Sequence, residues 1–460
     1  MVLSFESIQA LIFWSRMSSA RHRLSEPGRG IREYAACKNM EHYSIVLVIL
    51  GLIILLTALA ERLNWSSPIF LIVSGIAFSF MPGFKPVHIE SEVIFLLVLP
   101  PLLFDAAIKI PQKDLKEQFS TIGTLAFGLV FITTIGIGLL CRFMIPGMTW
   151  SLAFLLGAIL AATDAVAAIG VTKNLGLSHK TSVILEGESL LNDASALVAY
   201  QFALASVAGA AFIWWKAGLT FMILIAGGAL LGIVMAFVMG FLLRIVRHNA
   251  TAVNSFLLLA PFVTYLLAEE IHVSGVIAVV VLGFVISSKG KIHFSEKMNL
   301  QSENIWDMVI FLLNGMIFIL IGLELKEVIS DLDTYSIAIY CLYALIITIA
   351  AIVIRAWRIF TFKKKIEKGL NNPRFNKRGR ISENNLISVE ESIIISLSGM
   401  RGIVSLAIAL ALPLSMDDGS PFPMRAEILF ITFMVILYSV IGQGLLLPMV
   451  IKKLSQQREA

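Results

Sequence analysis

Charged residues are scarce in this sequence of 460 residues. Asp, Glu, Lys and Arg together make up 15% of it, whereas soluble globular proteins contain about 25%. Apolar residues make up 58%, and the mean hydropathy is +0.87. This composition excludes an ordinary soluble domain and predicts an integral membrane protein. The net charge of +5 does not indicate a nucleic-acid partner, because the basic residues lie in loops between apolar segments.

Cysteine and histidine are also rare. The three cysteines, Cys37, Cys141 and Cys341, are too few for a disulfide framework. The seven histidines lie outside the middle of the apolar segments, so no histidine-based metal cluster is expected. The sequence shows no phosphate-binding loop, and we expect neither ATP nor another cofactor. An intramembrane enzyme would need a nucleophile–base pair or a metal site within the apolar segments. Histidine and Cys–His pairs are missing from the middle of these segments, so we predict that the chain is not an enzyme.

Long apolar runs, in contrast, follow one another along nearly the whole chain. A helix needs about 20 mostly apolar residues to cross the hydrocarbon core of a bilayer. The sequence therefore predicts an all-α integral membrane protein with about 13 transmembrane helices. The predicted spans are 43–60, 65–83, 93–108, 121–145, 150–171, 181–207, 218–243, 253–268, 273–288, 305–325, 335–360, 391–414 and 426–451.

The loops between these spans differ in charge. Leaving the N-terminal tail aside, the loops on its side of the membrane contain five Lys and Arg residues, and those on the opposite side contain 24, ten of them between Arg355 and Arg380. Cytoplasmic loops are the ones rich in Lys and Arg. We therefore expect a cytoplasmic C-terminus and, with an odd number of spans, an N-terminus outside the cell.

The predicted organisation has four parts. Residues 1–39 form a basic tail with six Lys and Arg residues, which is either a tolerated disordered tail or an extension upstream of a true start at Met40. Residues 40–452 form the transmembrane domain, in which span 218–243 links spans one to six (about 43–207) to spans eight to thirteen (about 253–451). Within it, residues 361–390 form a basic cytoplasmic loop. Residues 453–460 form a short cytoplasmic tail.

Four charged residues lie well inside predicted spans: Asp164, Glu188, Asp193 and Arg401. A charged side chain at the centre of a bilayer costs about 2.5–3.5 kcal/mol even on the lenient insertion scale. At roughly 1.5 Å per residue, Asp164, Glu188 and Arg401 lie about 10, 12 and 15 Å from the cytoplasmic ends of their spans. We therefore expect the four charges to meet near one depth.

Polar residues of span 181–207 fall on two adjoining helix faces. Glu188 and Asn192 share one face, and Ser189 and Asp193 share the next, since each pair is four residues apart. Hydrogen bonds between helices would explain Asn192 or Ser189 alone. Such hydrogen bonds do not explain why three carboxylates and one arginine lie inside the membrane spans. We expect one carboxylate to pair with Arg401, which leaves acids that can exchange a proton for a cation.

Two predicted spans have interrupted cores. The stretches "LAATDAVAA" (160–168) and "SLSGMRGIVS" (396–405) combine small residues with a charge where a membrane helix should be most regular. They lie seven spans apart, so they cross the membrane in opposite directions. Corresponding helices of an inverted repeat have this relation, and their interrupted segments hold the ion in many secondary transporters. The sequence therefore predicts an inverted repeat with two discontinuous helices that cross.

Several motifs together resemble one known family. They are "LPPLLFDAA" (99–107), "ATDAVAA" (162–168), "EGESLLNDASALV" (186–198), "AEEIHVSGVIAVVVLGF" (268–284), "FLLNGMIFILIGLEL" (311–325) and "GMRGIVSLAIALALP" (399–413). In this order they are similar to the monovalent cation:proton antiporters of the NhaP/NHE type. The resemblance implies a core domain with two crossing unwound helices that moves against a dimerisation domain, and thus a homodimer. One departure is Ala165, where the family usually has proline.

The resemblance also implies roles for individual residues. Asp193 would bind the cation or the proton, and Ser189 with the backbone carbonyl of Thr163 would complete the oxygen shell of a Na⁺ ion. Asp164 would compensate the dipoles of the half-helices at the crossing. The resemblance further implies that Arg401 holds Glu188 and that Asn192 braces this pair.

The expected activity is exchange of a cytoplasmic monovalent cation, with Na⁺ preferred, for an external proton across the cell membrane. Asp193 is the one residue on its helix whose charge can change in each cycle, so we expect electroneutral one-for-one exchange in the service of sodium and pH homeostasis. K⁺ and Li⁺ remain alternatives, because the sequence does not give the size of the site. A cation channel is a second alternative, although the sequence shows no carbonyl ring or symmetric filter.

Overall fold

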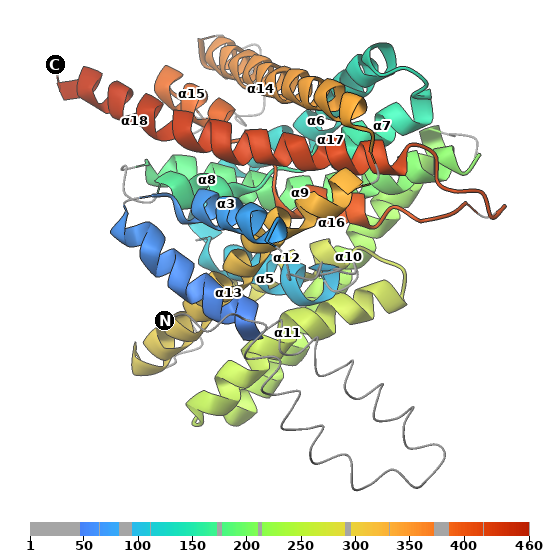
Figure 1. Ribbon diagram of the computed structural model, residues 1–460. Helices are drawn as coiled ribbons and strands as arrows, with labels where there is room; N and C mark the ends of the chain where they lie inside the picture. The colour runs from blue at the N-terminus through green and yellow to red at the C-terminus, as the bar shows by residue number, and fades with distance from the viewer. Residues whose placement is uncertain are drawn as a thin grey trace, which may run out of the picture.

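The computed structural model describes residues 47–63, 65–81, 94–110, 112–172, 177–209, 214–289, 296–330, 332–371, 386–416 and 418–459. These residues form an all-helical protein (Figure 1), and their only β-type pairing is an isolated bridge between Ser415 and Pro421. Seven of the described helices are long and apolar enough to cross a membrane, and three further apolar helices are shorter. The prediction of an all-α membrane protein is confirmed.

Each of the thirteen predicted spans contains one unbroken helix or two or three shorter helices in succession. The unbroken ones are 47–62, α3 (Ser67–Ser79), α6 (Gln112–Met144), α9 (His179–Val207), α10 (Trp214–Val246), α11 (Ala250–Glu270), α12 (Gly275–Lys289), α13 (Glu296–Ser330) and α14 (Thr334–Asn371). The composite ones are η1 (Ile94–Val98) with α5 (Leu99–Lys109), α7 (Trp150–Ile159) with α8 (Ala165–Thr172), α15 (Val389–Leu397) with α16 (Ile403–Leu410), and α17 (Arg425–Tyr438) with η3 (Ser439–Gln443) and α18 (Gly444–Glu459). That the chain crosses the bilayer thirteen times stays a prediction.

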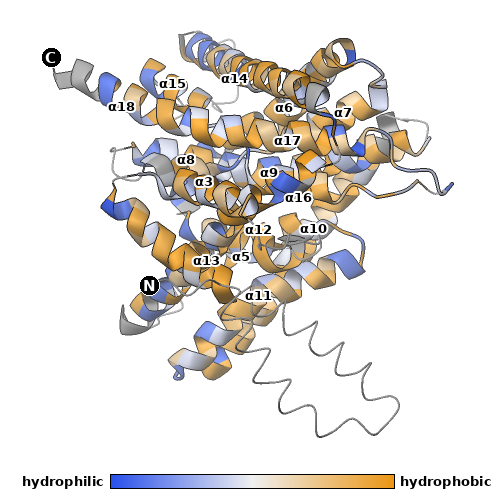
Figure 2. Cartoon of the chain, viewed as in Figure 1, coloured by the Kyte–Doolittle hydropathy of each residue, from blue (hydrophilic) through white to orange (hydrophobic). Residues whose placement is uncertain are grey.

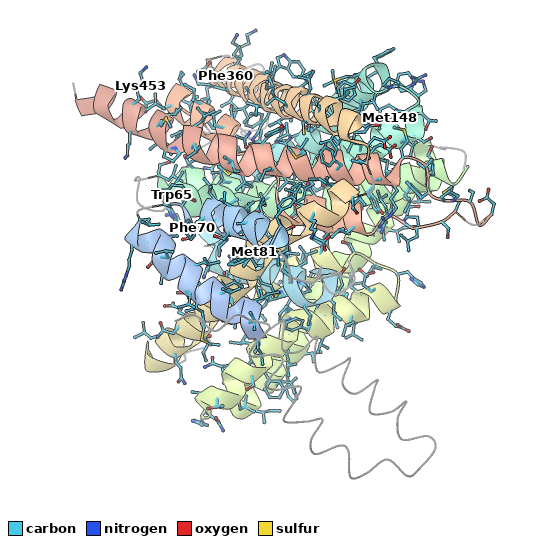
Figure 3. All side chains as sticks on the ribbon, viewed as in Figure 1. Trp65, Phe70, Met81, Met148, Phe360 and Lys453 are labelled. Atoms are coloured by element: carbon cyan, nitrogen blue, oxygen red, sulfur yellow. The ribbon has the colours of Figure 1, made fainter. Side chains whose placement is uncertain are left out.

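Local sequence explains where several helices begin. Pro68 lies in the first turn of α3, and Pro100 and Pro101 lie in the first turn of α5. N–H groups in the first turn of a helix have no partner within that helix, so proline, which lacks an N–H, fits there without loss of a hydrogen bond. The proline pair therefore starts a helix after the π-helical turn η1. Ser388 and Glu391 form a reciprocal capping box at the start of α15. At the beginning of α3, Trp65 and Phe70 make an edge-to-face contact with ring centroids 6.0 Å apart (Figure 3).

The helices pack as two groups. In the first, helix 47–62 and α3 pack against α13, and α12 packs against α5, α10 and α11. In the second, α6, α7 and α9 pack together, and α14 lies against both α6 and α17. Where α3 meets α13, Gly75 and Gly322 face each other so closely that an added Cβ on either would collide with the opposite backbone. Small residues permit this close helix packing inside a membrane.

Apolar residues predominate along the helices, including those on the outside of the molecule (Figure 2). Large side chains such as Phe143, Leu47 and Phe241 are at least 65% exposed. Contiguous exposed apolar surface is unfavourable in water, and it is the expected surface of a protein that contacts lipid. These helices and this apolar surface are those of a multi-pass membrane protein.

Two predicted loop segments are in part helical. The basic loop expected at 361–390 begins inside α14, which continues to Asn371, and the tail expected from residue 453 is part of α18, which ends at Glu459. In both cases charged residues continue the helix past the apolar span, because Lys, Arg and Glu are good helix formers. The predicted tail 1–39 and residues 372–385 lie outside the described part of the chain.

Candidate ion-binding site

Two interrupted helices contact each other at the centre of the site. Residues 160–164 separate α7 from α8, and residues 398–402 separate α15 from α16. The backbone N–H of Asp164 donates to the carbonyl of Met400 at 2.7 Å, which joins the two interruptions directly. Both interruptions lie where the sequence predicted them, and Ala165 in place of proline does not restore a continuous helix.

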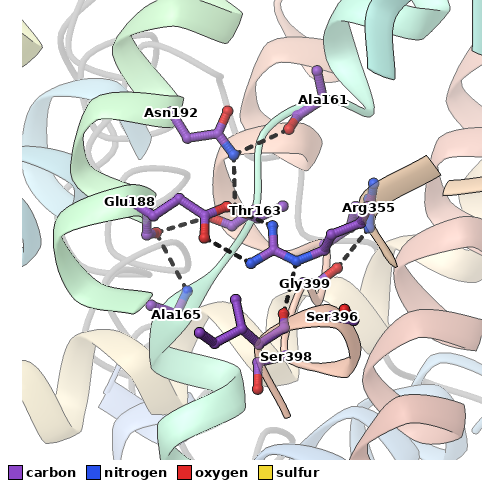
Figure 4. Close-up of polar contacts among 12 residues, drawn as sticks. Ala161, Thr163, Ala165, Glu188, Asn192, Arg355, Ser396, Ser398 and Gly399 are labelled. Atoms are coloured by element: carbon purple, nitrogen blue, oxygen red, sulfur yellow. Dashed lines mark hydrogen bonds and ion pairs between the residues drawn. The ribbon is translucent and has the colours of Figure 1, made fainter. Parts of the chain in front are cut away.

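Side chains of α9 hold the first interruption in place (Figure 4). Ser189 Oγ donates to the carbonyl of Thr163 at 2.8 Å and accepts from the N–H of Ala165 at 3.3 Å. Asn192 Nδ2 donates to the carbonyl of Ala161 at 3.2 Å and to Thr163 Oγ1 at 2.8 Å. Backbone groups left without helical partners in a membrane need such substitutes. Asn192 therefore supports the unwound segment 160–164. Its amide N–H groups do not contact the ion pair of Glu188, which it was predicted to brace.

Asp164 lies at the N-terminal ends of two half-helices. Its Oδ1 accepts from the N–H of Ala167 at 3.2 Å, which makes it the N-terminal cap of α8. Its side chain also lies directly over Gly402, the residue before α16, where an added Cβ would collide with it. Helix N-termini carry partial positive charge. The carboxylate thus lies beside the partial positive ends of α8 and α16. That it compensates their dipoles stays a prediction.

Arg401 lies at the carbonyl ends of the other two half-helices, α7 and α15. Its Nε donates to the carbonyl of Leu160 at the end of α7 at 3.1 Å, and its Nη1 donates to the carbonyl of Gly399 after α15 at 2.6 Å. The backbone N–H of Arg401 donates to Ser439 Oγ at 2.9 Å, and Ser439 in turn donates to Gln443 Oε1 at 3.0 Å. The guanidinium therefore offsets the negative ends of two half-helices, and η3 supports the second interruption.

The partner predicted for Glu188 was wrong. Glu188 binds Arg355 of α14, whose Nη1 and Nη2 lie 2.5 and 2.8 Å from the two carboxylate oxygens (Figure 4). Arg355 Nε also donates to the carbonyl of Ile395 at 2.9 Å. Glu188 is 1% exposed and Arg355 is 2% exposed. A planar guanidinium matches a carboxylate in this two-bond geometry, while the guanidinium of Arg401 donates to backbone carbonyls.

Asp193 faces a cavity of about 370 Å³ between the two helix groups. The cavity is lined by Thr163, Asp164, Glu186, Ser189 and Asp193 on one side and by Leu103, Asp105, Lys109 and Ile310 on the other. Asp193 is 6% exposed, and within the described residues no hydrogen-bonding group reaches its Oδ1. The charges of Asp193 and Asp164 interact. A buried carboxylate oxygen that faces a cavity can accept either a proton or a cation.

The family of the chain follows from sequence comparison. The sequence model of the transmembrane sodium/hydrogen exchangers matches residues 47–453. The chain belongs to the sodium/hydrogen exchanger family.

Several curated exchangers are similar to it. A protein of Bacillus pumilus named sodium, potassium, lithium and rubidium/H⁺ antiporter is 33% identical over 431 residues, which cover 91% of this chain and 62% of that protein. The Na⁺/H⁺ antiporter NhaH of Halobacillus aidingensis is 33% identical over 425 residues, which cover 89% of this chain and 97% of that protein. The chain thus spans under two thirds of the Bacillus pumilus relative's length and nearly all of the Halobacillus aidingensis one.

A solved exchanger has the same fold. The sodium proton antiporter MjNhaP1 of Methanocaldococcus jannaschii superimposes with a TM-score of 0.67 at 21% identity, and the match covers 90% of this chain and 98% of that one. At this identity the similarity supports the helical architecture alone.

Sequence reasoning missed four residues of this candidate site. Arg355, Ser439, Asp105 and Lys109 all contact or line it. Asp105 lay within a recognised motif, and a carboxylate in the apolar stretch "LPPLLFDAA" was the signal that could have found it. Ser439 carried no signal, because a serine in an apolar span is common and its role depends on the π-helical turn.

Proposed function

We propose that this chain is a secondary active antiporter that exchanges a monovalent cation, with Na⁺ preferred, for a proton. The observation that carries the proposal is Asp193, a membrane-buried carboxylate whose Oδ1 faces a cavity beside an interrupted helix. The membership in the exchanger family and the names of the relatives support the same activity.

The proposed chemistry is competition for one carboxylate. Asp193 holds either a proton or the cation, and it releases one when it takes the other. The carbonyl of Thr163 accepts one hydrogen bond from Ser189 and keeps a second lone pair for the ion. Ser189 Oγ offers a further oxygen. Carboxylate, carbonyl and hydroxyl oxygens suit a hard cation, and Na⁺ is the transported substrate in this scheme.

One titrating carboxylate implies one proton for each monovalent cation. Glu188 is neutralised by Arg355, and Asp164 caps α8. The loaded carrier then has the same net charge in both directions, and the exchange is electroneutral. The test is Na⁺-driven proton movement in proteoliposomes with the voltage clamped by K⁺ and valinomycin. A rate or end point that shifts with the imposed voltage would mean more than one proton for each cation.

The two helix groups fit the proposed transport cycle. The group that contains α7–α9 and α14–α18 carries the ion-binding residues, and the group that contains α3, α5 and α10–α13 provides the opposite wall of the cavity. We propose that the first moves against the second in a homodimer in the cell membrane, with the C-terminus in the cytoplasm and the N-terminus outside. The proposed role is sodium and pH homeostasis.

The decisive experiment reconstitutes the purified protein into liposomes. An imposed pH gradient should drive Na⁺ uptake, and Na⁺ should dissipate the gradient in return. Repeating the assay with K⁺, Li⁺ and Rb⁺ tests the alternative suggested by the name of the Bacillus pumilus relative. A channel would pass Na⁺ without moving protons, so uncoupled flux would contradict the proposal.

A further inference from the structure

Three charged side chains line the cavity at its partly exposed end, and a fourth contacts one of them. Asp105 and Lys109 lie one helical turn apart on α5, Glu186 lies two turns before Asp193 on α9, and Asp307 lies on α13. Asp105, Lys109 and Glu186 line the cavity itself. The charges of Lys109 and Asp105 both act on Glu186. A cation that reaches Asp193 from this end must pass through their field.

Asp105 has one bound and one open carboxylate oxygen. Its Oδ2 lies 3.0 Å from Lys109 Nζ, and within the described residues its Oδ1 is buried without a hydrogen-bond partner. The Asp105 residue is only 6% exposed. Its negative charge therefore faces the cavity and is offset chiefly by the ammonium of Lys109.

The ammonium of Lys109 is shared between two carboxylates. Nζ lies 3.0 Å from Asp105 Oδ2 and 3.0 Å from Asp307 Oδ1, so it bridges a buried acid and an acid whose side chain is 66% exposed. The lysine side chain itself is 47% exposed. A lysine carries its charge on a flexible stem with rotatable donors, so it can move toward either partner without a change of backbone.

We propose that Lys109 is a tethered counter-cation that competes with the transported ion at the mouth of the cavity and sets the apparent affinity for it. This inference rests on the proposed exchange function. When the ammonium stays on Asp105, it neutralises the mouth and repels an incoming cation. When it moves to Asp307, Asp105 becomes available to attract one. Asp307 is then a positioning residue, because it acts through Lys109.

The proposal predicts opposite effects at the two partners. Lys109→Gln removes the competing charge, and the apparent KM for Na⁺ should fall roughly threefold or more, since local potentials concentrate counter-ions severalfold. Asp307→Asn leaves Asp105 as the remaining partner of the ammonium among the described residues, and the apparent KM should rise. Lys109→Arg keeps the charge and should stay near the wild-type KM. A merely structural ion pair would not give changes of opposite sign.

The experiment measures exchange against Na⁺ concentration at one fixed pH in proteoliposomes. Two controls separate the tethered cation from the general surface charge. Glu303 is exposed and lies one turn before Asp307 on α13, so Glu303→Gln removes the same charge without touching Lys109 and should leave the KM unchanged. In the Lys109→Gln/Asp307→Asn double variant, the Asp307 change should have no further effect, because its action requires the lysine.

Each outcome decides the proposal. A KM that moves in the same direction in both single variants overturns it, as does an equal effect of Glu303→Gln and Asp307→Asn. Asp307 is exposed, so its variant should fold even if Lys109→Gln does not, and an unchanged or lower KM in Asp307→Asn is sufficient to reject the idea. The midpoint of Na⁺-dependent thermal stabilisation in detergent should shift in the same directions as the KM. Wild-type protein that shows no exchange would instead contradict the proposed function.

Discussion

Replacing Asp193 by Asn exchanges one oxygen for an amide group of the same size and removes the ionisable charge. Asp193→Asn should therefore reduce exchange to the level of empty liposomes while the protein remains folded by size-exclusion chromatography. Asp418→Asn is the control, because hydrogen bonds from Ser420 lower the pKa of this exposed carboxyl and keep it charged at the pH values tested. It should retain wild-type exchange. Residual Na⁺-driven proton movement in Asp193→Asn would refute the assignment.

The buried pair of Glu188 and Arg355 gives a prediction about stability. Arg355→Met leaves an uncompensated carboxylate in a site with 1% exposure, and such a loss costs about 3–5 kcal/mol. The Arg355→Met/Glu188→Gln double variant removes both charges and should recover part of that loss. The measurement is the Tm of each variant in detergent. A double variant no more stable than Arg355→Met would show that charge pairing is not what Arg355 contributes.

Residue identity predicted the polar stripe of α9 but not all of its partners. Glu188, Ser189, Asn192 and Asp193 were placed correctly by helical spacing, because the 3.6-residue period fixes their faces. Arg355 was grouped with the loop cations that follow it. Long basic side chains near the end of an apolar span usually reach toward water, whereas Arg355 turns inward to the carbonyl of Ile395 on α15, which packs against α14. That packing is a tertiary feature without a local signature.

At the scale of helices, the close contact between the two interruptions depends on a glycine. A Cβ at Gly402 would collide with the side chain of Asp164, so Gly402→Ala should push the two interruptions apart. Because small displacements of reacting groups are costly, exchange should fall roughly ten- to hundredfold. Gly240→Ala in α10, where a Cβ would meet no described atom within 4 Å, is the matched control. Equal rates in the two variants would mean that this contact is not needed for transport.

Helix positions were predictable to different degrees. The apolar runs located the helices because burial in lipid demands long uniform segments, and small residues beside a charge marked both interruptions. The extensions of α14 and α18 were missed, since the criterion of apolarity ends where a helix leaves the membrane. The π-helical turn η3 was also missed, because one extra residue in a turn does not alter the apolar pattern of its span.

For the whole molecule, competition at one carboxylate predicts a pH dependence of definite sign. As the pH falls, the protonated fraction of Asp193 rises, and the protonated form cannot bind Na⁺. The apparent KM for Na⁺ should therefore increase toward acid pH, with a limiting slope of about tenfold per pH unit for one proton. The measurement is the Na⁺ dependence of exchange at a series of equal internal and external pH values. A KM that is the same from acid to alkaline pH would contradict competition.

The hydrogen bond between Asp164 and Met400 has a consequence for biosynthesis. Residues 160–164 are synthesised well before residues 398–402. The N–H group of Asp164 therefore lacks its partner, Met400, while the intervening helices are inserted into the membrane. We expect the early half to stay incompletely assembled until α15 and α16 arrive, since an unpaired backbone group in lipid is costly. Expressed alone, a fragment that ends before α11 should be degraded quickly, and co-expression of the remaining helices should protect it. Formation of the ion site would then be the step that completes assembly of the two halves of the chain and protects both from degradation.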